Sequence, residues 1–294
     1  MENAMEKTIE TPKKRKTGLG DTWQQLKKNK AAVFSLFLIV AIILVAIFAP
    51  LIAPYSYDKQ SPSESFAPSS SEHLLGTDKL GRDVFSRLVY GARQSLLIGL
   101  ISVLIAAVIG IFIGVIAGYF GGWADNLLMR ILDVYQSIPM LLLCITLAAV
   151  LGPSLRNAII AIGVSMIPQF ARMMRASILS VREMEYIDAA KSINAKNFHI
   201  IMKHVVPNAI SPLIVSITMN VGSAILIGAM LSFIGLGVQP PIPEWGTLIS
   251  DARNYMRGNP TLALYPGICI MITVLAFNML GDGLRDALDP RLKN

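Results

Sequence analysis

Hydrophobic residues in this chain are grouped into six long runs that are separated by polar stretches. An α-helix rises about 1.5 Å per residue, so about 20 apolar residues cross the ~30 Å hydrocarbon layer of a membrane. The pattern therefore predicts an all-α protein with six membrane-spanning helices. The expected spans are residues 31–53, 95–120, 127–151, 158–174, 210–237 and 262–280.

The polar stretch 180–207 lies between the fourth and fifth spans and predicts a helical hairpin outside the membrane. Ser180 and Glu183 have the spacing of a capping box, which indicates that a helix begins directly after Ser180. Asn194 suits a left-handed turn that ends this helix, and Pro207 is expected to close the second one. The side chains expected to share one face are Tyr186, Ala190 and Ile193 in the first helix, and Phe198, Ile201, Met202 and Val205 in the second.

Two polar loops are expected on the opposite side of the membrane. In the loop 54–90, an apolar stripe favours a short helix resting on the membrane surface, with an external gate or partner contact as the alternative. The stripe consists of Val84, Phe85, Leu88 and Val89. The charged residues beside it, Asp78, Arg82, Asp83 and Arg87, have no spacing that demands chemistry, and His73 has no companion at a metal-binding spacing. In the loop 238–260, prolines exclude a helix at the start, and residues 247–256 predict one short helix.

Two spans contain residues that interrupt their apolar pattern. The second span carries glycines at every fourth position, which predicts close helix packing, with a permeation path as the alternative. These are Gly110, Gly114 and Gly118. In the third span, Pro139 predicts a kink. Arg130 and Asp133 lie near the inner end of this span, where ion pairing or reaching toward the interface is favoured over a proton relay.

Composition and charge support a membrane location. The chain is 53% hydrophobic and 15% charged, with a mean hydropathy of +0.56, which is too apolar for an ordinary soluble domain. The net charge of +7 comes from basic residues beside the apolar runs, without the aromatic and basic interleaving of a nucleic-acid surface. Most of the 26 Lys and Arg fall on the side of both termini, so both termini are expected in the cytoplasm, with the basic N-terminal tail touching anionic lipid.

The chain lacks the motifs of a self-powered or catalytic protein. It has no phosphate-binding loop, no zinc-protease motif and no nucleophile elbow. The middles of the spans carry no ionisable residue of the kind that ion-coupled carriers place there. Cys144 and Cys269 lie in apolar runs and are expected to be small packed side chains. We therefore expect energy to come from another subunit, while a secondary carrier and a membrane-embedded enzyme remain alternatives.

The polar hairpin and several other motifs resemble one transporter family. YIDAAKSIN at 186–194 and HVVPN at 204–208 look like the EAA loop of ABC importer permeases. The segments LGTDKLGRDVFSRLVYGARQSL at 75–96, LSFIGLGVQPPIPEWG at 231–246 and GDGLRDALDPRL at 281–292 are similar to the C-type permease subunit of the dipeptide, oligopeptide and nickel group. Asp188 replaces the usual Glu and Asn194 the usual Gly, and both keep the physical role of the residue they replace.

This resemblance implies a type I ABC importer permease with the MetI-like fold, in the plasma membrane of a bacterium or archaeon. The implied organisation is a cytoplasmic tail at 1–30, a first span at 31–53, an outer loop at 54–92, a permease core at 93–285 and a cytoplasmic tail at 286–294. The core includes the EAA loop at 178–208 and an outer loop at 238–260. The implied partners are a homologous second permease, two ABC ATPases that bind ATP and magnesium, and an external substrate-binding protein, so this chain itself is expected to hold no cofactor.

The resemblance also assigns roles to residues. The residues implied in coupling to the ATPase are Tyr186, Asp188, Ala189, Ala190, Ile193, Asn194 and Pro207, with the two alanines permitting close approach. Asp188 is expected either to pair with a basic residue of the ATPase or to hold the loop's own fold. The candidates to line the path are Ser216, Met219, Asn220 and Ser223, although this polar face could instead pack against the second permease. The implied cargo is a peptide, with nickel as the alternative.

Overall fold

The computed structural model describes residues 19–288, which form helices and one isolated β-bridge. Expectations for the basic residues before residue 19 and for the tail after residue 288 lie outside the described residues. The elements are α1 (Leu19–Lys28), α2 (Lys30–Ile47), α3 (Ala49–Ile52), η1 (Pro62–Glu64), α4 (Val84–Phe120), α5 (Gly122–Gln136), α6 (Met140–Leu151), α7 (Leu155–Arg182), α8 (Glu185–Ser192), α9 (Asn197–Ile200), η2 (Ile201–Val205), α10 (Val206–Ala209), α11 (Ser211–Phe233), α12 (Trp245–Ala252), η3 (Arg253–Tyr255) and α13 (Thr261–Leu288).

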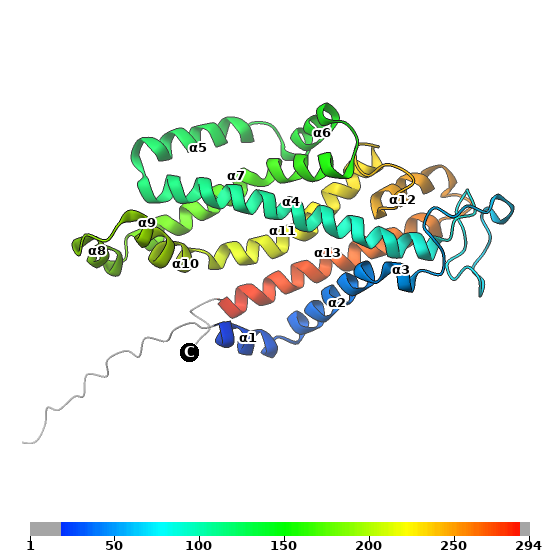
Figure 1. Ribbon diagram of the computed structural model, residues 1–294, viewed down its shortest axis with the longest axis horizontal. Coiled ribbons are helices and arrows are strands. Elements are labelled where there is room, and N and C mark those ends of the chain that lie inside the picture. The colour runs from blue at the N-terminus through cyan, green and yellow to red at the C-terminus, as the bar shows by residue number, and fades with distance from the viewer. Residues whose placement is uncertain (1–18, 289–294) are drawn as a thin grey trace, which may run out of the picture.

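The long helices run along a common axis, and the short helices and loops collect at its two ends (Figure 1). Within residues 19–288, five helices are long and apolar enough to cross a membrane, and the bent pair α5 and α6 supplies a sixth crossing if it counts as one span. The prediction of an all-α protein is confirmed, and the six expected spans agree with this count. We call residues 183–210 the foot and the loops 53–83 and 234–260 the cap, which lie at opposite ends of the bundle.

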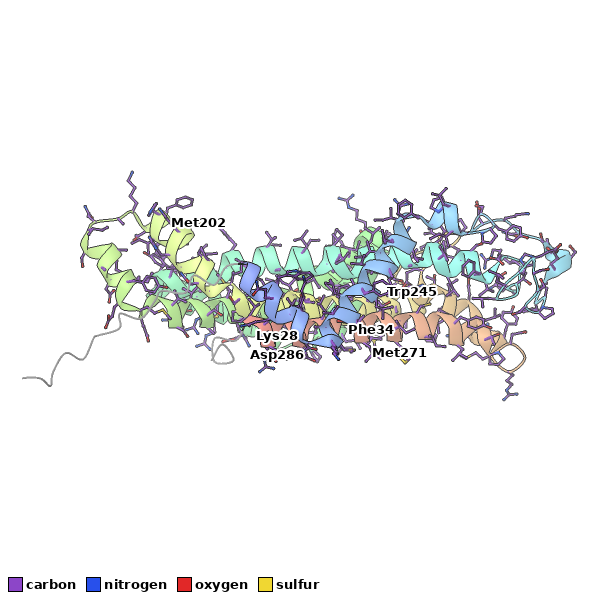
Figure 2. All side chains as sticks on the ribbon, turned by 90° about the horizontal axis from the view of Figure 1, so that it is seen from below. Lys28, Phe34, Met202, Trp245, Met271 and Asp286 are labelled. Atoms are coloured by element: carbon purple, nitrogen blue, oxygen red, sulfur yellow. The ribbon has the colours of Figure 1, made fainter. Side chains whose placement is uncertain are left out.

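Helix α1 belongs to the stretch that was expected to be a basic tail. Leu26 of α1 is buried with Ala32 of α2 and Ala287 of α13, so the first and last described helices meet at the end of the bundle that carries the foot. Figure 2 shows Lys28 and Asp286 on this same part of the molecule. Phe34 and Met271 are mostly exposed, as expected for apolar side chains on helices that face lipid.

The expected close packing of the second span is confirmed, and α7 is its neighbour. A Cβ atom added at Gly110 would lie 2.6 Å from the Cβ of Phe170. The same atom added at Gly114 would lie 2.6 Å from the Ala171 carbonyl oxygen, and at Gly118 it would lie 3.0 Å from the Cβ of Ile178. The three glycines therefore bring the backbones of α4 and α7 together from Gly110 to Gly118.

The third span is broken rather than only kinked. Helices α5 and α6 meet at an angle of 82°, and Pro139 lies directly before the first residue of α6. Ion pairing is confirmed for Asp133, whose partner is Arg172 of α7 at 2.6 Å, whereas Arg130 forms no ion pair within the described residues. Asp125 accepts from Arg175 of α7 at 2.5 Å. Both pairs join α5 to α7 and hold the inner half of the broken span in place.

The prediction of a short surface helix at residues 84–89 was wrong, because these residues form the first turns of α4. The Asp83 carboxylate accepts the backbone N–H of Ser86 at 2.7 Å, which caps α4 and starts the helix at Val84. Val84 and Leu88 are buried in the core instead of lying on a membrane surface. The short helix expected in the second loop exists as α12, which starts two residues earlier than predicted because Glu244 and Thr247 form its capping box.

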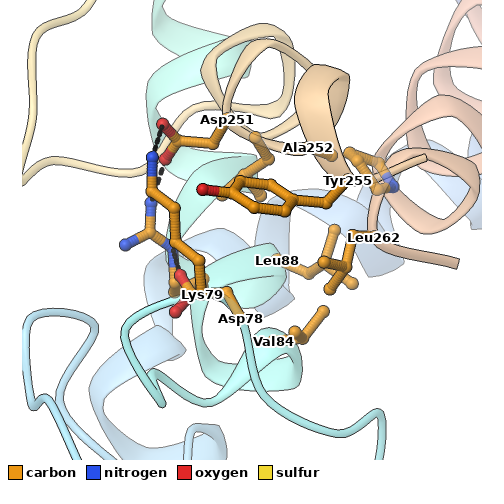
Figure 3. Close-up of a pocket in the computed structure, with 11 residues that line it drawn as sticks. Asp78, Lys79, Val84, Leu88, Asp251, Ala252, Tyr255 and Leu262 are labelled. Atoms are coloured by element: carbon orange, nitrogen blue, oxygen red, sulfur yellow. Dashed lines mark hydrogen bonds and ion pairs between the residues drawn. The ribbon is translucent and has the colours of Figure 1, made fainter. Parts of the chain in front are cut away.

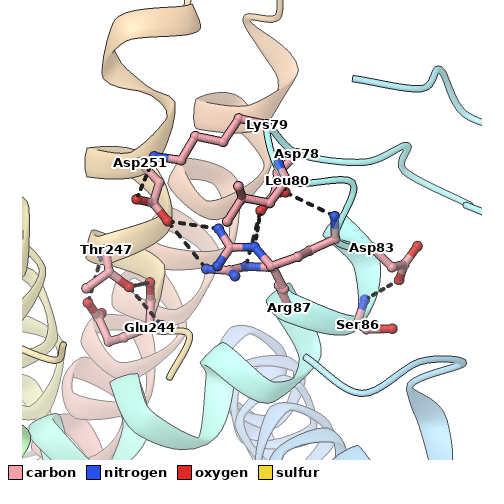
Figure 4. A network of polar contacts seen from close by, with 10 residues as sticks. Asp78, Lys79, Leu80, Asp83, Ser86, Arg87, Glu244, Thr247 and Asp251 are labelled. Atoms are coloured by element: carbon pink, nitrogen blue, oxygen red, sulfur yellow. Dashed lines mark hydrogen bonds and ion pairs between the residues drawn. The ribbon is translucent and has the colours of Figure 1, made fainter. Parts of the chain in front are cut away.

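The charged residues of the cap, to which the sequence assigned no role, form a buried ionic cluster that joins the first loop to α12 (Figures 3 and 4). Arg82 donates to Asp78 at 2.6 Å and to Asp251 at 3.3 Å, and Arg87 donates to Asp251 at 3.4 Å. The ring nitrogen Nδ1 of His73 lies 2.9 Å from Asp83. Asp251 is more than 160 positions away from Arg82 and Arg87, so only the packed cap brings these three residues together.

Candidate functional site

The foot is anchored to the ends of three long helices by its own apolar core. Ile187 and Ala190 of α8, Ile200 of α9 and Val205 of η2 are buried together against α7 and α11. The members of this cluster from the long helices are Tyr119, Met174, Ile178, Val181 and Leu213. A force on the foot is therefore transmitted to the bundle through packed side chains.

Two polar links join the end of α4 to its neighbours, one to the foot and one to the last residue of α7. The Tyr119 hydroxyl donates to the side-chain oxygen of Asn197 at 3.0 Å. Arg182 donates to the backbone carbonyls of Gly118 and Tyr119 at 3.2 Å and 3.1 Å, which satisfies carbonyls that the end of α4 leaves open. The sequence analysis did not assign these three residues to the site, because their partners lie more than 60 positions away.

The capping box predicted at Ser180 does not form. The Ser180 hydroxyl donates to the Ala176 carbonyl at 3.3 Å, one turn back, because α7 continues without interruption to Arg182. The next helix, α8, begins at Glu185 with no side-chain cap. The predicted helix start is therefore wrong by four residues.

The prediction that Pro207 closes the second helix was also wrong. Pro207 lies in the first turn of α10, where its missing N–H needs no partner. The π-helix η2 lies directly before α10. Its backbone is wider than an α-helix, because the Val206 N–H bonds to the Ile201 carbonyl five residues earlier. The helical path continues to Ala209, which carries the foot directly into α11.

The residues predicted to share one face of the first helix of the foot do not share one environment. Ile187 and Ala190 are buried, whereas Tyr186 and Ile193 are exposed. Ala189 is exposed, so only one of the two alanines is free for close approach from outside. The left-handed turn is confirmed: Asn194 has φ of 55°, and its N–H donates to the Lys191 carbonyl at 2.9 Å.

Asp188 pairs within its own helix. Its carboxylate accepts from Lys191 at 2.8 Å, and both side chains are well exposed to solvent. Exposed pairs of this kind stabilise a protein by at most ~1 kcal/mol, so this pair leaves Asp188 available to a partner. Partial burial raises the pKa of the nearby Tyr186 phenol above its ordinary value, which is already high enough to keep the side chain neutral at physiological pH.

The foot exposes several large apolar side chains. Phe198 is 76% exposed, Ile193 is 80% exposed, and Met202 lies one helical turn beyond Phe198. We call the exposed residues Met184, Tyr186, Ile193, Phe198 and Met202 the apolar patch of the foot. Figure 2 shows Met202 at this end, well away from the spans. An apolar patch outside the spans is typical of a protein interface.

Three of the four path candidates lie in one open groove between α7, α11 and α13. Ser216, Met219 and Asn220 line this groove, which has a volume of about 770 Å³. Asn220 donates to the Ser216 hydroxyl at 3.0 Å, which fixes the orientation of its amide. Ser223, the fourth candidate, is exposed on α11 and is not part of the groove lining. Gln169 and Arg285 also line the groove, and the sequence analysis did not select them.

Metal-binding and redox chemistry find little support in this part of the chain. Among residues 19–288, no group of three or more His, Cys, Asp or Glu side chains is placed to hold a metal ion. Cys144 and Cys269 are free thiols packed among apolar side chains.

Comparison with known families identifies the chain. Residues 110–294 match the model described as "Binding-protein-dependent transport system inner membrane component", and residues 18–68 match "N-terminal TM domain of oligopeptide transport permease C". The chain belongs to the binding-protein-dependent transport permease family. This permease is a multi-pass protein of the bacterial plasma membrane, and its family works with ATPase and substrate-binding components.

Similar proteins cover almost the whole permease. The dipeptide transport system permease protein DppC of Alkalihalophilus pseudofirmus is 49% identical over 93% of this chain and 90% of its own length. The glutathione transport system permease protein GsiD of Escherichia coli is 42% identical over 96% of this chain and 93% of its own length. Both relatives are permease subunits, which are not catalytic.

Solved structures share the fold of this permease. A methionine ABC transporter captured in inward-facing conformations matches 70% of this chain and 98% of its own chain, with a TM-score of 0.59 and 21% identity. An amino acid ABC transporter matches 67% of this chain and 92% of its own chain, with a TM-score of 0.53 and 14% identity. These likenesses confirm the predicted type I importer permease fold.

Proposed function

We propose that this permease is one of two homologous transmembrane subunits of a peptide importer, and that it supplies half of the translocation path. The curated relatives, which are named for dipeptide and glutathione transport, support a peptide cargo. The foot faces the cytoplasm in this proposal, and the cap faces the external binding protein. The chain itself holds no cofactor, because ATP and magnesium bind to two partner ATPases.

The attachment of the foot is the observation that carries the proposed mechanism. Its exposed apolar patch offers a docking surface, and its buried core joins α8 to the ends of α4, α7 and α11. Closure of the two ATPases would move the foot, and the packed core would convert that movement into rocking of the long helices. Ala189 and the neutral phenol of Tyr186 would lie at the contact with the ATPase.

Polar side chains on the outer faces of the spans support a second permease subunit. Ser223 of α11, Gln136 of α5 and Gln169 of α7 are exposed on helices that cross the membrane. Exposure of an amide side chain to lipid is unfavourable, because lipid offers it no hydrogen-bond partner. A homologous subunit covering this side would enclose these groups together with the groove beside α11.

The test uses the whole importer in proteoliposomes. The chain is co-purified with the second permease, the ATPases and the binding protein encoded beside it, and uptake of tritiated dialanine is measured together with ATP hydrolysis. Ala189→Arg places a long cation on the exposed face of α8 and is expected to lower uptake and binding-protein-stimulated ATP hydrolysis at least tenfold. Ala189→Ser, which keeps the small size, is the matched control and is expected to retain both activities.

Three outcomes contradict parts of this proposal. Unchanged uptake with Ala189→Arg would show that this face of α8 does not contact the ATPase. Uptake of nickel ions without uptake of dialanine would assign a different cargo. Transport by complexes that lack the second permease would show that this chain forms a complete path by itself.

A further inference from the structure

A second polar cavity lies at the break between α5 and α6. It has a volume of about 230 Å³ and is lined by the last turn of α5, the first turn of α6 and the middle of α7. The bend of 82° turns α6 away from the line of α5 (Figure 1). Its polar lining residues are Tyr135, Gln136, Ser165 and Gln169.

The polar groups of this cavity have unused hydrogen-bonding capacity. The Tyr135 hydroxyl is buried, makes no hydrogen bond of ordinary length and angle within the described residues, and has the Ser165 hydroxyl as its polar neighbour. The Ser165 hydroxyl donates to the Ala161 carbonyl at 2.7 Å, which leaves its oxygen free to accept. A buried hydroxyl without a partner is unfavourable, so a ligand that supplies a partner gains affinity from this site.

The lining restricts the chemistry of that ligand. Its four polar side chains are uncharged, and the remaining lining residues are apolar: Ile138, Pro139, Met140, Leu143 and Met166. Such a lining suits a neutral group that both donates and accepts hydrogen bonds next to an apolar side chain. An amide bond of a peptide has this chemistry. The volume lies below the ~300–1,000 Å³ typical of sites for whole drug-sized ligands, so the cavity fits part of a peptide.

The cavity and the groove beside α11 share one lining residue. Gln169 lines both spaces, with the cavity on the side of α5 and the groove on the side of α11. Breaks in membrane-spanning helices are where many transporters hold their substrates.

We propose that the cavity at the α5–α6 break is a hydrogen-bonding subsite for a peptide amide during translocation, with Tyr135 and Gln169 as its main contacts. The proposal rests on the proposed function of the chain as a peptide permease. Tyr135 bonds the amide while the peptide passes, and Gln169 hands it from the cavity to the groove beside α11. Neither residue contacts the foot, so their effect is on delivery of peptide and not on the ATPase.

The test measures peptide delivered for each ATP hydrolysed. The assembled importer is reconstituted in proteoliposomes with its binding protein saturated by tritiated dialanine. Tyr135→Phe removes only the hydroxyl, and Gln169→Leu removes the amide from an exposed position. Tyr265→Phe, on α13 and outside both spaces, is the matched control. Loss of one neutral hydrogen bond is expected to lower the delivered peptide about threefold to tenfold in the first two variants.

The outcomes separate this subsite from the proposed function. Reduced delivery in Tyr135→Phe and Gln169→Leu, with normal binding-protein-stimulated ATP hydrolysis and a normal Tyr265→Phe control, supports the subsite. Normal delivery in both variants overturns it and leaves peptide import standing. If the unmodified importer delivers no dialanine, the proposed function and the subsite fall together. If the importer with Tyr135→Phe does not assemble, peptide delivery by the Gln169→Leu importer alone decides whether the subsite exists.

Discussion

The backbone angle of Asn194 shapes the turn between the two parts of the foot. Its φ of 55° is accessible to Gly and Asn at little cost but strained for a β-branched residue. We expect Asn194→Gly to preserve transport. Asn194→Val should destabilise the turn by about 1–2 kcal/mol and reduce coupled ATP hydrolysis. Thermal unfolding of the purified complex and its stimulated ATPase rate measure the two effects, and equal behaviour of the two variants would contradict this expectation.

The contact between α4 and α7 at Gly114 has no room for even one methyl group. An added Cβ atom would lie 2.6 Å from the backbone oxygen of Ala171, and backbone atoms cannot move aside as a flexible side chain can. Gly114→Ala is therefore expected to destabilise the protein by about 1–3 kcal/mol. The measurement is thermal stability in detergent. Gly267→Ala on α13, where an added Cβ meets nothing within 4 Å, is the control and should be neutral or slightly stabilising.

Helix α8 has two faces with separate roles, and a pair of isoleucines distinguishes them. Ile187 is fully buried in the core of the foot, whereas Ile193 is 80% exposed. Ile187→Ala is expected to destabilise the foot by about 2–5 kcal/mol, because it leaves a cavity. Ile193→Ala should leave the fold intact and weaken only the contact with the ATPase. Protease sensitivity of the foot reports the first effect, and affinity for the purified ATPase reports the second.

The position of α12 in the cap depends on the charge of Asp251. This carboxylate lies 3.3 Å from Arg82 and 3.4 Å from Arg87, two side chains that are almost completely buried. Asp251→Ala would leave part of that positive charge without a partner, at a cost of about 1–3 kcal/mol because Asp251 itself is partly exposed. Thermal unfolding measures this loss. Glu72→Gln, a change to an exposed carboxylate of the same cap, should have no effect.

At the scale of the whole molecule, we expect transport to depend on energy that other subunits supply. Its foot and cap lie at opposite ends of a bundle whose groove opens beside α11. Liposomes that contain this chain alone are expected to show no dialanine uptake under a proton or sodium gradient. The complete importer should require both ATP and binding protein. Gradient-driven uptake by the single chain would favour a secondary carrier, the alternative left open by the sequence.

Residues that are neighbours in the chain were enough to predict much of the secondary structure and helix packing of this protein. The six apolar runs, the close packing at Gly114, a bend at Pro139 and the turn at Asn194 each depend on residues that are neighbours in the chain, although the sequence predicted only a kink at Pro139. The corresponding signals are the length of the apolar runs, the missing side chain of glycine, the missing N–H of proline and the tolerance of asparagine for a positive φ. The motifs of the foot also indicated the family before any contact was known.

Only the tertiary structure decided which side chains meet. The ionic cluster of the cap joins Arg82 and Asp251, and the foot is tied to α4 by Tyr119 and Asn197. Pairs this far apart leave no periodic signal in the sequence. The start of α8 and the burial of Ala190 were wrongly predicted for the same reason, since α7 and the core of the foot determined them. The cavity at Tyr135 likewise exists only because three helices converge at the break.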